Sequence, residues 1–153
     1  LEIFSKQLPY VSMRMFNVYG PGQDLTNLKQ GMVSIFIAQA IESKKILVKG
    51  SLQRFRDFIY INDTVDAWYK ATISDEVENI AINIGTGQKT SVEELLMKIK
   101  NKINGISFFS NGSTPGDQSG VFADNSKLKK LLNFKSFTSL EDGLQKYIDY
   151  LSQ

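Results

Sequence analysis

The 153-residue sequence contains no cysteine and no histidine. Without cysteine the chain has no disulfides, no thiolate nucleophile and no cysteine-ligated zinc, which fits a reducing compartment. Without histidine it lacks the commonest general base and metal ligand, and every catalytic triad that depends on imidazole. Apolar runs of the roughly 18 residues that a membrane span needs are missing, as is a charged-then-apolar leader. We therefore expect a cytoplasmic protein without a metal centre.

A strong charge of either sign is also missing, because the net charge is +2 and the charged residues are interspersed. This balance does not predict nucleic-acid or membrane binding, and any bound anion should be small and local. Hydrophobic residues make up 42% of the chain, which is enough for one real core. Disorder is therefore not the expected state.

Strand-like and helix-like segments alternate along the chain and predict a layered α/β or α+β domain. The expected strands are 9–16, 46–50, 57–61, 80–84 and 106–109, and the expected helices are 31–43, 64–74, 91–105, 125–134 and a final helix after residue 138. The strands at 9–16 and 80–84 have the character of central sheet strands, yet few other strands are available to cover their edges. We expect these two strands to pair with each other or with a neighbouring chain.

Helix start signals precede three of the expected helices. Asp63 can cap the helix at 64–74, and capping boxes are expected at Ser91 with Glu94 and at Thr138 with Glu141. These assignments fix where each helix should begin.

One side of the helix at 64–74 carries Val65, Trp68, Tyr69 and Ile73. Its aromatic rings could stack on a base or a sugar, but an aromatic stripe at helical spacing more often belongs to a core. We therefore expect this stripe to be buried.

The stretch RMFNVYGPGQ, residues 14–23, ends the first strand in a loop with two glycines and a proline. In one interpretation Asn17 bonds to its own backbone in a tight turn. In the other, its amide binds a phosphate or sugar oxygen at the carboxyl end of a strand, where open α/β sheets usually bind ligands. Both interpretations stay open from the residues alone.

Five basic residues and no acidic one lie between positions 44 and 56. Alternation in the sequence RFRDF places Arg54 and Arg56 on one face of a strand. They form either a solvated basic edge or a site where Arg56 grips phosphate through paired hydrogen bonds. The later sequence TPGDQ is either a turn or a loop whose Asp117 accepts hydrogen bonds from ribose hydroxyls.

Carboxylate pairs such as Asp57 with Asp63, or Glu93 with Glu94, would suit acid/base chemistry of the glycosidase type. We do not favour that interpretation, because Asp63 and Glu94 already have roles at helix starts.

Four segments in order resemble the C-terminal half of the NAD-dependent epimerase/dehydratase family, the extended short-chain dehydrogenases that act on nucleotide sugars. They are LPYVSMRMFNVYGPGQ, ILVKGSLQRFRDFIYINDTVDAW, AINIGTGQKTSVEEL and TPGDQSGVFADNSKLKKLLNF. The resemblance implies an α/β fold made of the last Rossmann strands and a small substrate-binding domain, without the N-terminal Rossmann core. Residues 1–153 would form one truncated domain. Residues 1–24 and 78–104 would belong to the Rossmann part, and residues 25–77 and 105–153 to the substrate-binding part.

The resemblance also implies a set of ligand contacts. Asn17 and Arg56 would bind the pyrophosphate of the substrate, Leu47, Val48 and Lys49 would line the nucleobase pocket, Asp117 would reach the ribose, and Phe16 would lie near the nicotinamide of NAD.

Some positions depart from the family pattern. Leu52 and Thr114 stand where the family has a glycine and often an arginine, so one phosphate ligand could be lost. The dinucleotide fingerprint and the catalytic Tyr-x-x-x-Lys pair occur nowhere in these residues, because no tyrosine has a lysine four positions later. Since the sequence begins at Leu1, we expect both features, and most of the NAD site, upstream of it.

The resemblance favours a UDP-sugar 4-epimerase, an isomerase whose parent protein transiently oxidises the sugar with NAD. The fragment alone would be inactive. A dehydratase, decarboxylase or reductase of the same family is an alternative, and so is a non-catalytic nucleotide-binding module. The expected partner is a nucleotide sugar, with strand pairing or oligomerisation of the fragment as a further possibility.

Overall fold

The computed structural model describes residues 8–27, 29, 31–112 and 118–153. Its elements are β1 (Val11–Met15), β2 (Asn17–Tyr19), α1 (Met32–Ser43), β3 (Lys45–Lys49), β4 (Phe55–Arg56), β5 (Phe58–Tyr60), α2 (Ile61–Thr72), β6 (Ile80–Ile84), β7 (Thr90–Ser91), α3 (Val92–Lys102), β8 (Ser107–Asn111), α4 (Ser126–Leu131) and α5 (Leu140–Leu151). This order confirms the α/β class. Among the described residues, no helix combines the length and the apolar character that a bilayer crossing requires. The sequence LEIFSKQ, residues 1–7, has the pattern of the last turns of a helix, and it lies outside the described residues.

The strands form two-stranded pairs. Parallel pairs join β1 to β6, β2 to β5 and β3 to β8, and an antiparallel pair joins β4 to β7. In the first pair Val11 lies opposite Ile80 and Met13 opposite Ile82. The expected pairing of these two strands is therefore confirmed. The opposite edge of β1 has no strand partner within the described part of the chain.

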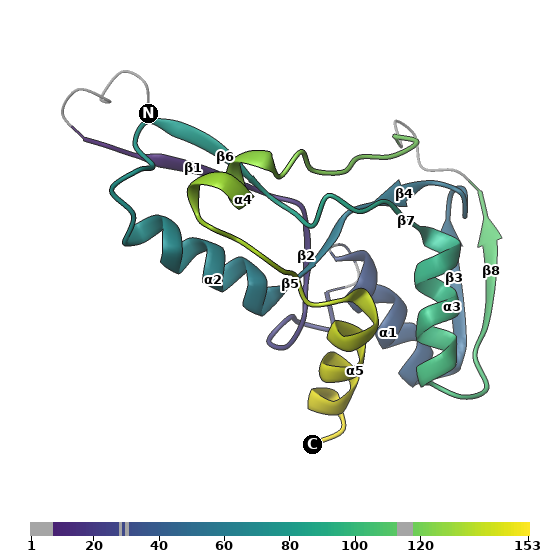
Figure 1. Ribbon diagram of the computed structural model, residues 1–153. Coiled ribbons are helices and arrows are strands. Elements are labelled where there is room, and N and C mark those ends of the chain that lie inside the picture. The colour runs from purple at the N-terminus through teal and green to yellow at the C-terminus, as the bar shows by residue number, and fades with distance from the viewer. Residues whose placement is uncertain (1–7, 28, 30, 113–117) are drawn as a thin grey trace.

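Two clusters of buried side chains form the core. The first joins α1, α3 and α5 to β3, and the second joins α2 and α4 to β6. Strand β5 lies between them: Phe58 and Tyr60 belong to the first cluster and Ile59 to the second, because successive strand residues point to opposite faces. Figure 1 shows β1, β6, α2 and α4 at one side of the molecule and α1, α3, β3 and β8 at the other.

This grouping does not follow the expected division of the chain. Helix α3 lies within residues 78–104, which were assigned to the Rossmann part, yet it packs in the first cluster. Helix α2 lies within residues 25–77, which were assigned to the substrate-binding part, yet it packs with β6. The domain boundaries stay a prediction.

Of the three predicted helix caps, the structure confirms the one at α3. The Glu94 amide donates to Ser91 Oγ at 3.1 Å, and the Ser91 amide donates to Glu94 Oε2 at 2.7 Å, which confirms the capping box of α3. The prediction for α5 is wrong by one residue. The cap is Ser139, whose Oγ accepts from the Asp142 amide at 3.1 Å.

The prediction that Asp63 caps α2 is also wrong. Helix α2 starts directly after β5, with Tyr60 as its cap residue, so that Asp63 lies within the first turn. The Asp63 carboxylate instead accepts hydrogen bonds from the Thr138 amide at 2.8 Å and from the Thr138 hydroxyl at 3.0 Å. Asp63 therefore fixes the segment that leads into α5.

The prediction that the apolar stripe of α2 is buried is wrong as well. Small residues, namely Thr64, Ala67 and Ala71, form the buried side of the helix. The large side chains Trp68 and Tyr69 are 48% and 63% exposed. The helical period identified a common side, but a neighbouring side of α2 packs against the core.

A small ionic cluster joins α3 to α5, and it yields a pH-dependent prediction. Lys98 Nζ and Lys102 Nζ lie 3.0 and 3.1 Å from the Glu141 carboxylate, and hydrogen bonds from Lys98 and then Lys102 lower the pKa of Glu141 below its ordinary 4.5. A lowered carboxyl pKa stabilises the fold above the unfolded-state pKa, and this contribution is lost as the pH falls through the folded-state pKa.

We expect Glu141→Gln to cost at most about 1 kcal/mol at pH 7, because the Glu141 carboxylate itself is half exposed and solvent screens its two ion pairs. The difference from the parent chain should vanish at a pH below the lowered folded-state pKa. Urea unfolding at neutral and acidic pH measures both values. An equal loss at both pH values would show that the charge of Glu141 is not the cause.

Candidate functional site

Asn17 lies where β1 ends, at the first residue of β2. Its backbone amide and its side-chain Nδ2 both donate to the Asp57 carbonyl oxygen, at 3.1 and 3.0 Å. The expected loop thus begins as a short strand paired with β5. The tight-turn interpretation required the Asn17 side chain to bond to its own backbone, and it does not. It is held instead by a residue 40 positions later in the chain.

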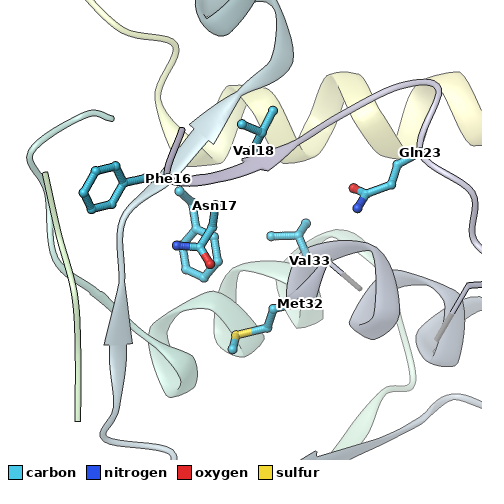
Figure 2. A pocket seen from close by; sticks show the side chains of 8 residues that line it. Phe16, Asn17, Val18, Gln23, Met32 and Val33 are labelled. Atoms are coloured by element: carbon cyan, nitrogen blue, oxygen red, sulfur yellow. The ribbon is translucent and has the colours of Figure 1, made fainter. Parts of the chain in front are cut away.

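A hollow of about 270 Å³ opens beside Asn17. It is lined by Phe16, Asn17, Val18, Gln23, Gly31, Met32, Val33 and Phe58. Figure 2 shows Asn17 approaching this space from β2 and Gln23 from the loop after β2, whereas Met32 and Val33 approach it from α1. The hollow therefore combines two amide side chains with apolar walls, which is the usual composition of a small-molecule site.

A hydrogen-bonded chain of side chains fixes Gln23 from behind. The Ser34 hydroxyl donates to Gln23 Oε1, and Ser34 Oγ lies 3.0 Å from the Tyr147 hydroxyl. Ser34 and Tyr147 are buried, and burial raises the pKa of Tyr147, so its hydroxyl stays protonated. Gly31 has φ +85°, and a Cβ there would collide with Gln23 Nε2. Sequence reasoning missed this arrangement, because its members come from three separate segments.

A second hollow of about 430 Å³ lies beyond Phe16 and Asn17. It is lined by these two residues together with Arg14, Met15, Asn83 and Val121. Phe16 and Asn17 thus line both hollows. Both open near the carboxyl ends of the parallel strands β1 and β6, which is where open α/β sheets usually bind ligands.

Asp57 is a fully buried carboxylate behind Asn17. Its Oδ1 accepts from the Thr86 amide at 2.9 Å and from the Thr86 hydroxyl at 2.6 Å. Its Oδ2 accepts from the Gly87 amide at 2.9 Å and from the Ala123 amide at 3.1 Å. Since Asp57 holds these donors and Asp63 holds Thr138, neither carboxylate is placed for the acid/base pairing considered above.

The glycine turn after β6 does not provide a phosphate cradle in this arrangement. The amides of Thr86 and Gly87 already donate to Asp57. In the first turn of the next helix, α3, the Val92 and Glu93 amides donate to the carbonyl oxygens of Arg54 and Leu52, and the Glu94 amide donates to Ser91 Oγ. A helix start binds phosphate through amides that are available to the ligand. These donors are therefore structural.

Arg56 lies on β4, next to Asp57. Its Nη1 donates to the carbonyl oxygens of Phe55 at 2.8 Å and Gln118 at 3.2 Å. Arg56, the expected pyrophosphate clamp, is linked to Asn17 through Asp57, which follows Arg56 in the chain and whose carbonyl oxygen binds Asn17. Arg56 does not line either hollow described above.

The expected nucleobase contacts lie apart from Asn17. Leu47, Val48 and Lys49 belong to β3, which pairs with β8. The Val48 side chain is fully buried in the first core cluster, so a ligand could reach only its backbone. Asp117 and Thr114 lie outside the described residues. The roles of all these residues stay predictions.

Comparison with known proteins gives a consistent picture. The model of the NAD dependent epimerase/dehydratase family matches residues 4–85, which is more than half of the chain. An uncharacterized UDP-glucose epimerase from Bacillus subtilis is 33% identical over 95% of this chain. A dTDP-4-dehydro-6-deoxyglucose reductase from Escherichia coli is 30% identical over 97% of it. The match covers 45% and 47% of these relatives, so the chain spans about half of their length.

Solved structures share the fold. UDP-glucose 4-epimerase from Thermotoga maritima, determined with UDP-glucose, matches with a TM-score of 0.90 and 30% identity, over 99% of this chain and 49% of the epimerase. UDP-glucuronic acid 4-epimerase from Bacillus cereus, determined with UDP-glucuronic acid and NAD, matches with a TM-score of 0.87 and 28% identity, over 99% and 48%. The α/β architecture therefore corresponds to about half of such an epimerase.

Proposed function

Because the chain belongs to the NAD dependent epimerase/dehydratase family, we propose that it forms the substrate-binding portion of a nucleotide-sugar enzyme. The substrate that we favour is a UDP-sugar, and the reaction of the whole enzyme is epimerisation at C4. The observation that carries this proposal is the position of Phe16 and Asn17 between two hollows at the carboxyl ends of β1 and β6.

In this proposal Asn17 orients the substrate. Its Nδ2 is fixed by the Asp57 carbonyl, so the rest of its carboxamide is presented at a defined angle to the first hollow. Gln23, whose Oε1 is occupied by Ser34, offers amide N–H groups to the sugar or to its phosphates. Fixed donors of this kind hold a charged substrate without reorganising when it binds.

NAD would supply reversible hydride transfer to and from the sugar when it is bound. The residues present fit it only in part. Phe16 offers an aromatic side chain beside the second hollow, but the glycine turn after β6 has its amides committed to Asp57. We therefore propose that this chain contacts NAD chiefly at Phe16 and that the greater part of the NAD site lies in the half of the relatives that the chain does not span.

The enzymatic alternatives differ in the reaction, not in the substrate class, and a non-catalytic nucleotide-binding module is the alternative without a reaction. The relatives include a reductase, a trifunctional enzyme with dehydratase activity and a UDP-glucuronic acid decarboxylase as well as epimerases, which keeps reduction, dehydration and decarboxylation open for a whole enzyme. Since these residues hold no Tyr-x-x-x-Lys pair, we expect the 153-residue chain alone to be catalytically inactive. Conversion of UDP-glucose into its 4-epimer by the purified chain with NAD would refute this expectation.

Arg56 provides the test of the substrate class. We expect the chain to bind UDP, and Arg56→Ala to weaken this binding about 10-fold to 100-fold, since a charge-assisted hydrogen bond contributes roughly 1.5 to 3 kcal/mol. Calorimetric titration measures both affinities. Uridine, which has no phosphate, should bind the two forms equally well.

Lys129→Ala on α4 is the matched control, because it removes one positive charge far along the chain from β4. It should leave the affinity for UDP unchanged. Absence of UDP binding to the parent chain, or an equal affinity of the Arg56→Ala variant, would count against the proposed clamp.

A further inference from the structure

Two buried hydroxyl groups connect the last helix, α5, to the hollow beside Asn17. Tyr147 on α5 and Ser34 on α1 are 0% and 1% exposed, and Tyr147 lies in the first core cluster. A buried hydroxyl costs free energy unless it is hydrogen-bonded, whereas phenylalanine and alanine at these positions would bring no polar atom into the core. The hydrogen bonds of these two hydroxyls lead to Gln23, which lines the hollow.

The hydrogen bonds of this group run in one direction. A serine hydroxyl has a single proton, and Ser34 donates it to Gln23 Oε1. The 3.0 Å contact between Ser34 Oγ and the Tyr147 hydroxyl therefore uses the proton of Tyr147. Burial raises the pKa of Tyr147, so this proton is retained. Tyr147 thus donates to Ser34, and Ser34 donates to Gln23.

This direction determines which end of the Gln23 carboxamide reaches the hollow. Because Ser34 occupies Oε1, the amide Nε2 lies on the other side of the group, where a Cβ on Gly31 would collide with it. Gly31 lines the hollow, and Figure 2 shows the Gln23 side chain directed toward Val33, another lining residue. The terminal torsion of a glutamine is roughly two-fold, so an amide without an anchor can turn over. The bond from Ser34 selects the orientation that offers N–H groups.

Helix α5 is a firm base for these bonds. Its start is tied to α3, because Lys98 Nζ lies 3.0 Å from the Glu141 carboxylate. The segment before it is tied to α2 by the bonds from Thr138 to Asp63. A hydroxyl on a helix that is held at its start and buried along its length has a defined position. The Tyr147 hydroxyl can therefore orient a side chain that lies on a loop.

We propose that Tyr147 and Ser34 are positioning residues that act on the ligand through Gln23. They hold its Nε2 toward the hollow, so that this wall binds an acceptor oxygen of the ligand, from a phosphate or from a sugar. The inference rests on the proposed function, because it takes the hollow to hold the nucleotide sugar. It adds a role for α5, which contributes none of the described residues that line the hollow.

Removing the Tyr147 hydroxyl tests the proposal. We expect UDP-glucose to bind Tyr147→Phe about 3-fold to 10-fold more weakly than the parent chain, because the ligand must then immobilise the Gln23 amide itself. Calorimetric titration measures both affinities. Tyr150→Phe is the matched control, since it removes a hydroxyl from a position of α5 that is 48% exposed, and it should bind like the parent.

Titration with UDP identifies the source of the acceptor oxygen. A loss of equal size with UDP assigns it to the phosphates, and a loss confined to UDP-glucose assigns it to the sugar. Unchanged affinity of Tyr147→Phe for both ligands would overturn the proposal.

A second comparison shows whether Tyr147 acts through Gln23. In a Gln23→Ala background, Tyr147→Phe should not weaken UDP-glucose binding further, because the side chain that it positions is gone. A general structural role of Tyr147 would instead weaken binding by the same factor in both backgrounds. That result would refute the positioning role.

Nitrogen relaxation of the Gln23 side-chain amide tests the same link without a ligand. We expect its order parameter to fall in Tyr147→Phe and to stay unchanged in Tyr150→Phe. An amide that is as ordered in Tyr147→Phe as in the parent would contradict the proposal. If the parent chain binds neither UDP nor UDP-glucose, the proposed function fails, and the relaxation result still decides whether Tyr147 positions Gln23.

Discussion

Replacing Asp57 with alanine is expected to destabilise the chain by about 3 to 5 kcal/mol, since each buried donor left without a partner costs about 1 to 3 kcal/mol. Three backbone amides and one hydroxyl, contributed by Thr86, Gly87 and Ala123, would lose their acceptor at once. The Asp57 carboxylate links the turn at Thr86 and Gly87 to the segment at Ala123, and alanine has no polar atom that could replace it. A loss of this size is a large fraction of the roughly 5 to 15 kcal/mol by which a domain is stable.

Denaturant unfolding of Asp57→Ala measures the loss, and the midpoint of thermal unfolding should fall by about 10 °C or more. Asp66→Ala is the matched control. It removes the same side chain from an exposed pair one turn apart on α2, and should cost only about 0.5 kcal/mol. If the two variants lose equal stability, the four hydrogen bonds to the Asp57 carboxylate do not stabilise the fold as we expect.

Asp57→Asn separates charge and hydrogen bonding from size. The asparagine side chain has nearly the same volume, but one of its two acceptors becomes an NH₂ group that faces two existing donors. We expect a loss of about 2 to 4 kcal/mol, close to that of alanine. A variant as stable as the parent would mean that one oxygen is sufficient to hold all the donors.

Gly143→Ala is expected to be strongly destabilising, although alanine is normally favoured over glycine in a helix by about 0.5 to 1 kcal/mol. A Cβ at position 143 would collide with the Tyr19 hydroxyl oxygen and lie 2.9 Å from Tyr19 Cζ. Tyr19 is only 3% exposed, so its ring has little room to move. Overpacking a core costs about 1 to 3 kcal/mol, and we expect a net loss of about 2 kcal/mol.

A double-mutant cycle tests this explanation. The Tyr19 hydroxyl is buried without a hydrogen-bond partner among the described residues, and burial raises its pKa, so it stays a protonated donor. Tyr19→Phe alone should therefore be neutral or slightly stabilising. In the Tyr19→Phe background, Gly143→Ala should cost at least about 1 kcal/mol less than in the parent, because the closest atom is gone. Additive effects of the two substitutions would rule out a direct collision.

Local sequence patterns predicted what local physics determines. Alternating isoleucines identified β6, and its pairing with β1 followed from the lack of other central strands. The capping box of α3 was readable because Ser91 and Glu94 are three residues apart and satisfy each other. For strand β6 and for the capping box, one chain segment contains the whole signal, whereas the pairing of β1 with β6 was inferred by elimination.

Long-range contacts were not readable in the same way. Asp63 had the position of a helix cap, but its acceptors are used by Thr138, which is 75 residues away. Asn17 read as a loop residue because its hydrogen-bond partner Asp57, directly before β5, comes 40 residues later. The one available signal for Asp57 was a carboxylate directly before the apolar run FIYI, since a charge in a buried strand needs its own donors.

The pairing of strands has a consequence for how this chain reaches its native state. Every described strand pair joins strands that are not neighbours in the sequence, such as Val11 with Ile80 and Lys45 with Ser107. Such contacts require large loops to close before they contribute, which slows folding to about milliseconds to seconds. During synthesis β1 must wait until β6 has left the ribosome, and its apolar residues are exposed to aggregation and to chaperones for that time.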